Sequence, residues 1–172
     1  AGPTPAPAGA VDASDTVAQE TALAASPLSS TESGLVPEEG LHRRLTLELE
    51  RSAFQEQDLS VALFRFTRGT RGEELYRRNA QAILAFFSFE DLCFEYGEES
   101  IAVIFPGTTL GDSLGQIERF QRYYWEERMN WNAPEIDFVC GVSARNGRLV
   151  EGDRVMQECR AAVKRAETTT GR

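Results

Sequence analysis

The sequence predicts an α+β fold in which helices cover an antiparallel central sheet. Short apolar runs with the length of strands alternate with longer segments whose apolar residues recur every three or four positions, the period of a helix. The predicted order is helix, strand, helix, strand, strand, helix, strand, helix. The middle six elements form the βαββαβ pattern of a ferredoxin-like core, a split βαβ unit with an antiparallel sheet.

The first predicted helix lies in VPEEGLHRRLTLELERSAFQE, residues 36–56. Pro37 suits the first position of a helix, and the carboxylates of Glu38 and Glu39 suit the positive end of the helix dipole. The apolar stripe of this helix consists of Leu41, Leu45 and Leu49. The compact apolar run LSVALFRF, residues 59–66, then predicts a buried strand.

A second helix and a hairpin are predicted next. The segment EELYRRNAQAILAFF, residues 73–87, has helical periodicity. Its inward face is expected to consist of Leu75, Ala80, Ile83 and Leu84. The stretch DLCFEYGEESIAVIFP, residues 91–106, indicates two short strands that are joined by a tight turn around Gly97.

The last third of the chain predicts a long helix, a strand and a final helix. The long helix runs from about Leu110 to Met129. Its apolar positions are Leu114, Ile117, Phe120 and Tyr124. The strand is IDFVCGVSA, residues 136–144, and the final helix is RVMQECRAAVKRAE, residues 154–167.

Residues 1–30 form a predicted flexible linker, because they are rich in Ala, Pro and Ser and include no aromatic residue. Such a composition buries too little apolar surface to offset the entropy of ordering the chain. The folded domain is predicted at residues 31–172. Because the chain begins with Ala rather than Met, we expect it to be part of a larger protein, and a membrane anchor elsewhere in that protein stays open.

The net charge and the cysteine content limit which binding partners and metal sites we expect. The formal net charge of −9 disfavours nucleic acid. Direct membrane insertion is not expected, because no apolar run approaches the roughly 18–20 residues that cross a bilayer. The cysteines are Cys93, Cys140 and Cys159, with no CxxC spacing, and His42 is the single histidine. We therefore expect buried, reduced thiols in a cytoplasmic protein, an exposed histidine and no zinc site.

The turn of the predicted hairpin carries a motif. It reads GEESI, Gly97 to Ile101, within DLCFEYGEESIAVIFP. This stretch resembles D-L-x-x-R-Y-G-G-D-E-F-A-V-L-L-P, the signature of GGDEF domains, which is the diguanylate cyclase family. The matching positions are Asp91, Leu92, Tyr96, Gly97, Ala102, Val103 and Pro106, and Glu99 matches an aspartate conservatively.

Four further stretches resemble the same family, in the family's order. SGLVPEEGLHRRL is similar to the opening segment and keeps Gly34 and Leu35, whereas GEELYRRNAQAIL keeps Gly72 and Glu73. VCGVSA and CRAAVKRAE resemble the last strand and the last helix. The resemblance covers about residues 31–172 and implies a GGDEF, nucleotide-cyclase-like fold.

The departures from the family pattern predict a degenerate site. The resemblance implies that two GTP-loaded domains form cyclic di-GMP, with metal ions that neutralise the phosphates. The resemblance implies that a carboxylate at the end of the first strand binds a metal ion. This chain has Arg65 at that position, or Thr67 if the second aspartate of the family's strand pattern is counted. Ser100 replaces the catalytic acid. Glu98 replaces the second glycine, where it adds bulk and negative charge against phosphate.

Other functional positions depart as well. The segment from Arg65 to Glu73 is shorter than in the family and lacks the asparagine that reads guanine, and Glu167 replaces a phosphate-binding lysine. The resemblance also implies an inhibitory site, an R-x-x-D motif in which the planar guanidinium of arginine binds cyclic di-GMP. This chain keeps the aspartate of that motif as Asp91, but it has Ser88 in place of the arginine. We therefore expect no cyclase activity, no bound metal and no cofactor.

Two functions remain open. The first is a catalytically inactive GGDEF-like module for protein interaction or dimerisation in bacterial signalling, with another protein or a second copy as its partner. The alternative is a non-catalytic sensor that weakly binds GTP or cyclic di-GMP through Glu73, Glu99 and Asp91. The arginines near the shortened segment suit either phosphate binding or an exposed helix face, and they are Arg68, Arg71, Arg77 and Arg78.

An aromatic-rich segment, FQRYYWEERMNWN at residues 120–132, supports the interaction hypothesis. One helix cannot turn all of its aromatic residues toward the core, and exposed aromatic residues favour interfaces. The interface candidates are Tyr123, Tyr124, Trp125 and Trp131. The alternative, that some of them cover the edge of the core, stays open.

Overall fold

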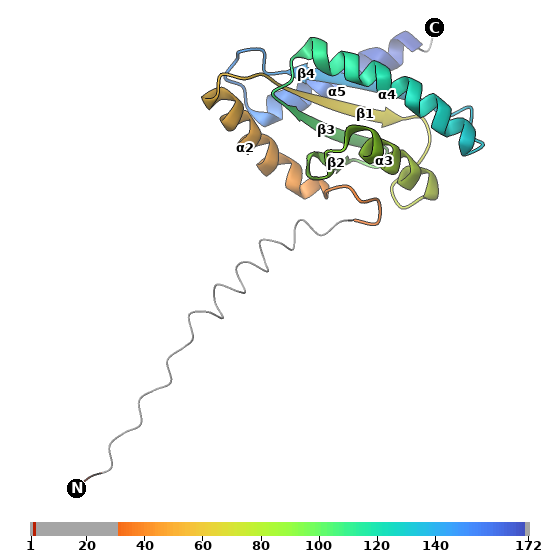
Figure 1. Ribbon diagram of the computed structural model, residues 1–172, viewed down its shortest axis with the longest axis horizontal. Coiled ribbons are helices and arrows are strands. Elements are labelled where there is room, and N and C mark those ends of the chain that lie inside the picture. Colours follow the sequence, from red (N-terminus) through yellow and green to blue (C-terminus); the bar gives the residue numbers. More distant parts are fainter. Residues whose placement is uncertain (1, 3–30, 171–172) are drawn as a thin grey trace.

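The computed structural model describes Gly2 and residues 31–170. Apart from Gly2, the predicted linker at residues 1–30 therefore lies outside the described part of the chain. The sheet has four strands in the order β2-β3-β1-β4, and each neighbouring pair is antiparallel (Figure 1). The strands are β1 (Leu59–Phe66), β2 (Cys93–Tyr96), β3 (Ser100–Pro106) and β4 (Phe138–Ala144).

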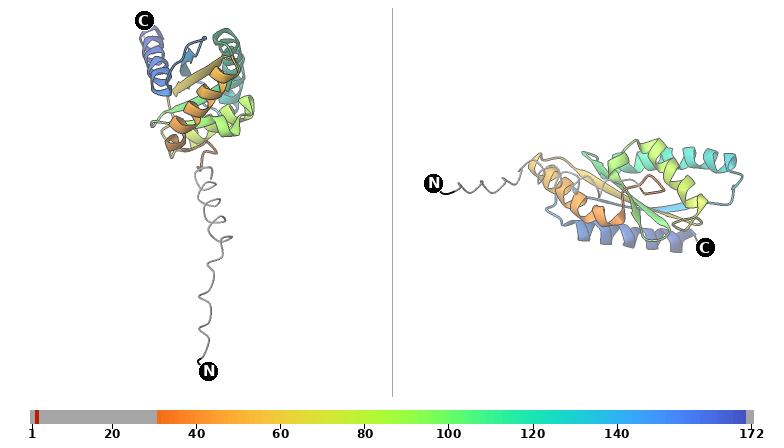
Figure 2. Two further views of the ribbon diagram at one scale, coloured as in Figure 1. Left: turned by 90° about the vertical axis from the view of Figure 1, so that its left-hand side faces the viewer. Right: turned by 90° about the horizontal axis from the view of Figure 1, so that it is seen from below.

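The main helices lie in two layers, one on each face of the sheet (Figure 2). They are α2 (Leu41–Phe54), α3 (Glu74–Phe87), α4 (Leu110–Asn130) and α5 (Gly152–Thr170), with 3-10 turns at Glu38–Gly40 and Glu90–Leu92. The layer of α3 and α4 packs on a core rich in aromatic rings, whereas α2 and α5 cover a mostly aliphatic core. Each face of the sheet thus has a hydrophobic core of its own.

Strand β1 contributes to both cores because successive side chains of a strand point to opposite faces. Phe64 belongs to the aromatic core, where its ring lies 5.4 Å from that of Phe120. Leu63 belongs to the aliphatic core. Every residue of β1 is buried except Arg65, which is exposed. This charged side chain therefore reaches solvent at the end of the most buried strand of the sheet.

The predicted elements are all present, and the α+β fold with its βαββαβ core is confirmed. Some details differ. Pro37 precedes a 3-10 turn, and the α-helix itself begins at Leu41. Leu114, one of the apolar positions of the predicted long helix, is 44% exposed. Ser113 is buried in its place because it continues the inward stripe of α4 four residues before Ile117.

The predicted environments of the histidine and of the thiols can be compared with the structure. His42 is exposed and lies 3.3 Å from Asp153. Cys93 and Cys159 are buried free thiols, as predicted, whereas Cys140 is only partly buried. Within the described part of the chain, each helix is too short or too polar to cross a membrane.

Candidate functional site

The motif turn between β2 and β3 lies beside the end of β1. Gly97 adopts a positive φ of 58°, a conformation that favours glycine and allows the chain to reverse. The backbone N–H of Phe66 donates to the carbonyl oxygen of Glu99 (3.2 Å), and Arg65 is paired with Ser100 in the ladder. The turn residues are therefore held against the strand end where the family pattern implies a metal carboxylate.

Arg65 joins two carboxylates at this place. Its Nη1 lies 2.9 Å from Glu167 of α5, and its Nη2 lies 3.5 Å from Glu99 of the turn. All three side chains are about half exposed. A charged cluster thus forms from β1, the motif turn and the last helix, with a guanidinium as its central cation.

The Arg65 cluster lines an open groove of about 440 Å³. Asp137 and Thr67 also line it. The hydroxyl of Thr67 is occupied by the backbone of Asp137, donating to its carbonyl oxygen (3.1 Å) and accepting from its N–H (3.0 Å). Among the described residues, no group of three or more His, Cys, Asp or Glu side chains is arranged to hold a metal ion.

A second arginine holds the other side of the turn. Arg71 Nη2 donates to the carbonyl oxygen of Gly97 (2.6 Å) and lies 3.1 Å from Glu38, which itself accepts from the N–H of Gly97 (3.1 Å). Arg71 Nε lies 3.5 Å from the buried Glu95, which also accepts from Ser33 (2.8 Å). Burial by itself lowers the pKa of Arg71, but the hydrogen bond to Glu38 and the charge of Glu95 raise it overall.

The three candidate nucleotide-binding carboxylates do not converge. Glu99 lines the groove of the Arg65 cluster, whereas Glu73 stands at the start of α3 and lines a separate cavity of about 280 Å³. Asp91 lies before β2, at the end of that strand away from the turn, and pairs with Arg44 of α2 (3.1 Å). The three carboxylates therefore do not form one binding site in this structure.

The arginines that suited phosphate binding each have an acidic neighbour. Arg68 pairs with Glu135 (2.8 Å), and Arg77 and Arg78 both pair with Glu74 on the same helix. These side chains are largely exposed, so the ion pairs contribute little to stability. Arg71 is different, because it is only one-third exposed and is tied to the motif turn.

The aromatic segment divides between core and surface. Tyr124 is fully buried and its hydroxyl donates to Asn79 Oδ1 (2.8 Å), so the expectation that it forms an interface is wrong. Burial also raises the pKa of its hydroxyl. Trp131 packs edge-on against Tyr124, and Tyr123 packs against Phe86 at the rim of the core. Trp125 is 41% exposed.

Sequence reasoning missed several residues of the turn region. Arg71 was considered only for phosphate binding or an exposed helix face, and Glu38 only for the positive end of the helix dipole. Asp137 and Glu95 were not considered. Asp137 had a weak signal, because it immediately precedes the last strand, which pairs with the end of the first one. Glu38 and Glu95 gave no signal, since their approach to Arg71 depends on the tertiary fold.

Comparisons with known proteins agree with this architecture. The coiled coil and GGDEF domain of DgcB from Caulobacter crescentus, solved in complex with c-di-GMP, is 15% identical, with 91% of this chain and 90% of that one covered and a TM-score of 0.71. Diguanylate cyclase SiaD from Pseudomonas aeruginosa, solved with its activator SiaC, is 19% identical, with 92% and 65% covered and a TM-score of 0.66.

The active GGEEF domain of a diguanylate cyclase from Vibrio cholerae is 16% identical, with 76% of this chain and 90% of that chain covered and a TM-score of 0.66. No protein-family model and no curated protein sequence matches the chain. At such identities the similarity establishes the fold, and a fold alone does not fix an activity. The chain is a GGDEF-like domain in its fold.

Proposed function

We propose that this chain is a non-catalytic GGDEF-like module that acts through protein contact in bacterial signalling. The observation that carries the proposal is the guanidinium of Arg65, placed where the resemblance implies a metal carboxylate and held by Glu99 and Glu167. A metal ion at this place would meet a fixed positive charge instead of a ligand. The carboxylate of Glu99 in the motif turn is meanwhile engaged in an ion pair within the chain.

The neighbouring motif positions support the same conclusion. Glu98 is exposed at the position of the second glycine, where its charge repels a phosphate. Ser100, at the position of the catalytic acid, is the first residue of β3 and offers a hydroxyl in place of a carboxylate. Without a metal and an acid, the phosphate charge that develops during nucleotidyl transfer has no partner.

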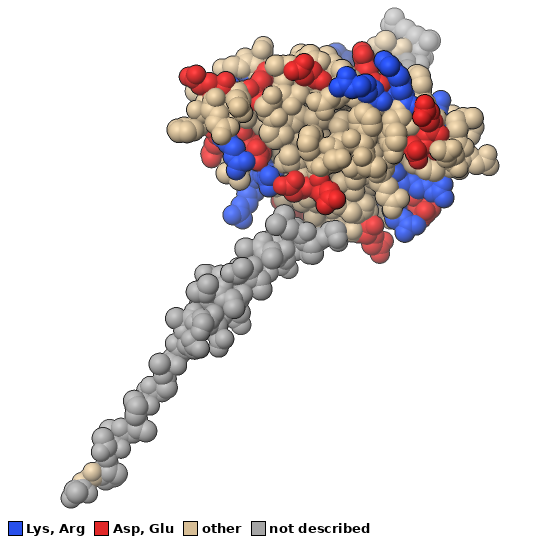
Figure 3. Space-filling view, in the orientation of Figure 1, with Lys and Arg blue, Asp and Glu red and all other residues tan. Residues whose placement is uncertain are grey.

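Protein contact has support from the outer face of α4. Four large apolar residues of this helix are 41–62% exposed, namely Leu110, Leu114, Trp125 and Met129. Their spacing places them within one broad side of the helix. In the face shown in Figure 3, charged side chains lie mainly toward the periphery and leave an uncharged area between them. SiaD, which has the same fold, is solved in complex with an activator protein.

The alternative function, a nucleotide sensor without turnover, is favoured by one observation. The cavity beside Glu73 is also lined by Arg71 and Arg77, so it offers both a carboxylate and guanidinium groups to a ligand. Its volume of about 280 Å³ is close to the lower limit of small-molecule sites, which is roughly 300 Å³. This cavity does not include the Arg65 cluster, so a sensor would not restore catalysis.

The proposal is tested by incubating the full chain with GTP and Mg²⁺ and measuring cyclic di-GMP by chromatography. We expect no product, and product formed by the wild-type chain would overturn the proposal. Thermal unfolding with GTP or cyclic di-GMP tests the alternative. Binding at 100 times the dissociation constant adds about 2.7 kcal/mol and raises Tm by several degrees. An unchanged Tm at millimolar nucleotide excludes the sensor.

The role of Arg65 has a matched pair of variants. Arg65→Asp places a carboxylate beside Glu99, whereas Arg65→Met removes the cation without adding a ligand. If Arg65 excludes metal, Mg²⁺ should raise the Tm of Arg65→Asp and leave the wild-type chain and Arg65→Met unchanged. Equal responses to Mg²⁺ in all three chains would contradict this role.

A further inference from the structure

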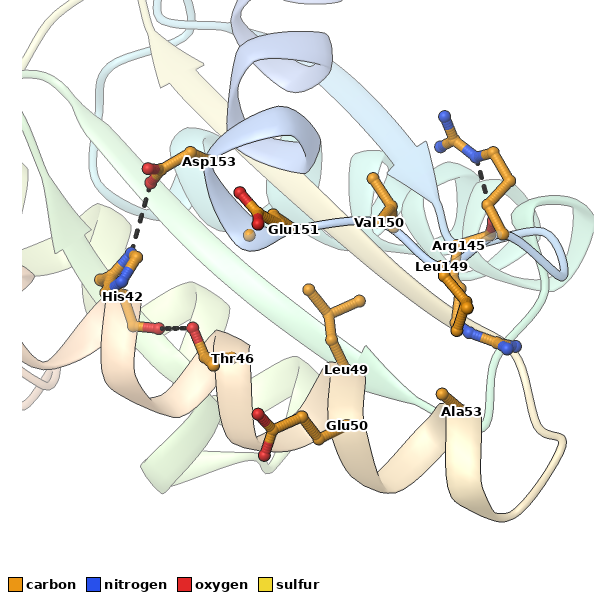
Figure 4. Close-up of a pocket in the computed structure, with 12 residues that line it drawn as sticks. His42, Thr46, Leu49, Glu50, Ala53, Arg145, Leu149, Val150, Glu151 and Asp153 are labelled. Atoms are coloured by element: carbon orange, nitrogen blue, oxygen red, sulfur yellow. Dashed lines mark hydrogen bonds and ion pairs between the residues drawn. The ribbon is translucent and has the colours of Figure 1, made fainter.

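A groove of about 580 Å³ lies between α2 and the segment that leads into α5 (Figure 4). Thr46, Leu49 and Ala53 line it from α2, and residues 148–153 line it from the other side. The groove includes no residue of the motif turn and none of the Arg65 cluster. The groove is therefore a separate site from the motif turn and the Arg65 cluster.

One large apolar side chain lies almost fully in solvent at one end of this groove (Figure 4). Leu149, which lines the groove, is 90% exposed, and Leu49 and Val150 also line it with apolar side chains. A single exposed apolar residue is ordinary, but an exposed leucine beside further apolar residues in one groove indicates a docking surface.

At the same end, Arg145 is an under-satisfied cation. It is only 8% exposed, and its Nη1 donates to the carbonyl oxygen of Gln57 (2.9 Å). Its Nε is buried and has no hydrogen-bond partner among the described residues. A buried guanidinium without a carboxylate is costly, so an acidic group delivered into the groove would be bound favourably.

The charge of the groove changes along its length. Figure 4 shows Arg145 and Ala53 at one end and His42 beside Asp153 at the other. Glu151 lies near Asp153 at the second end, and Glu50 lines the groove between the two ends (Figure 4). A fitting occupant therefore carries acidic residues where it meets Arg145 and uncharged residues where it passes the acidic end.

We propose that the groove binds residues 12–28 of the same chain, DASDTVAQETALAASPL, which lie outside the described part. Their charged residues are Asp12, Asp15 and Glu20, with no Lys or Arg. Their large apolar residues are Val17, Leu23 and Leu28. Between Glu20 and Thr31 the chain is uncharged. The segment thus has an acidic first part, which suits the end of the groove at Arg145, and an uncharged second part, which suits the acidic end.

The length of the chain permits this placement. Residues 42–53 of α2 extend over roughly 17 Å, at a rise of about 1.5 Å per residue. The ten residues 21–30 reach at most roughly 35 Å when extended. The described chain continues at Thr31, shortly before the start of α2 and its acidic end of the groove. The uncharged part thus passes Asp153 and brings Glu20 and Asp15 toward Arg145.

The test is hydrogen exchange of the full 172-residue chain, with the backbone amides of residues 12–28 as the readout. Leu149→Asp places a negative charge at the proposed docking surface and leaves the segment itself unchanged. We expect these amides to exchange about tenfold faster in Leu149→Asp than in the wild-type chain, which corresponds to a loss of about 1.4 kcal/mol of docking. Leu47→Asp, on α2 but outside the lining of the groove, is the matched control and should exchange like the wild-type chain.

A second variant tests the charges from the other side. In Asp12→Asn, Asp15→Asn, Glu20→Gln, the amides of residues 146–151 should exchange faster than in the wild-type chain. Exchange of residues 12–28 at one rate in the wild-type chain, Leu149→Asp and Leu47→Asp would overturn the proposal. Protection that disappears on dilution would also overturn it, because the occupant would then be a segment of a second copy.

Discussion

Gly141 shows how closely β4 and α5 approach each other. A Cβ atom at this position would lie 2.2 Å from the carbonyl oxygen of Cys159 and 2.7 Å from the backbone nitrogen of Val163. Both atoms belong to the backbone of α5, so no change of rotamer relieves the clash. We expect Gly141→Ala to lower the free energy of unfolding by about 3 kcal/mol or more, as measured by urea titration.

Gly111 provides the matched control for this substitution. It lies near the start of α4, and a Cβ atom there would meet nothing within 4 Å. Gly111→Ala should therefore stabilise the protein slightly, by about 0.5–1 kcal/mol, because alanine favours the helix. Equal effects of the two substitutions would show that β4 and α5 do not approach each other this closely at Gly141.

The buried thiols should make the free energy of unfolding fall at alkaline pH. Burial raises the pKa of Cys93 and Cys159 to about 12, above the value of 9.0 for an exposed thiol. Between these values the unfolded chain has released protons that the folded chain keeps, so stability is complete below pH 9 and falls as pH rises. The expected loss is about 1.4 kcal/mol per pH unit and thiol.

Urea titrations at pH 8, 9 and 10 measure this slope before most tyrosines ionise. Replacing one thiol, in Cys93→Ala, should remove that thiol's share of the slope even though it also changes the stability at pH 8. A slope that is the same in the wild-type chain and in Cys93→Ala would contradict the assignment of the pH dependence to Cys93.

At the scale of secondary-structure elements, one buried hydrogen bond connects α3 to α4. Tyr124 of α4 donates to Asn79 of α3, and Asn79 in turn donates to the carbonyl oxygen of Arg68 (3.2 Å), which fixes the loop before α3. Tyr124→Phe would leave the side-chain oxygen of Asn79 buried without this donor. We expect the substitution to lower the free energy of unfolding by about 1–3 kcal/mol.

A double-mutant cycle with Asn79→Ala tests whether the two residues act together. The two substitutions should be non-additive by at least about 0.5 kcal/mol, since each removes the same hydrogen bond. Trp125→Phe on the exposed side of α4 serves as the control and should change stability by less than about 0.5 kcal/mol. Additive effects of Tyr124→Phe and Asn79→Ala would contradict the proposed link.

The elements could be predicted from the sequence because their signals are local. The run at residues 59–66 became β1 with the same bounds, and the turn at Gly97 is present. Helical spacing groups Tyr124 with Phe120, but its hydrogen bond to Asn79 could not be predicted, because Asn79 comes from another helix. The exposed Leu114 shows the same limit, since neighbours in space decide which side of α4 faces inward.

The candidate site was predicted only in part for the same reason. The sequence showed that Arg65, Glu99 and Glu167 occupy functional positions of the family pattern, one by one. It did not show that their side chains meet, because they come from β1, the motif turn and the end of α5. The tertiary fold brings these three residues, which are distant in the sequence, into one ion-paired cluster.

At the scale of the whole molecule, the two hydrophobic cores share a single sheet. Phe120 lies in the aromatic core under α3 and α4, and Leu45 lies in the aliphatic core under α2 and α5. Because β1 contributes side chains to both, loss of either core should unfold the other. We therefore expect a single cooperative unfolding transition, with both Phe120→Ala and Leu45→Ala lowering its midpoint.

The two tryptophans make this coupling measurable. Trp125 and Trp131 both lie on or directly after α4, so their fluorescence reports on the side of the aromatic core. Leu45→Ala, on the opposite side of the sheet, should remove about 2–5 kcal/mol and shift the tryptophan-monitored midpoint as far as the midpoint seen by far-UV circular dichroism. If the tryptophan signal kept its wild-type midpoint while the circular dichroism midpoint fell, the cores would unfold separately. The sheet would then not couple the motif turn and Arg65 to the face that carries Trp125.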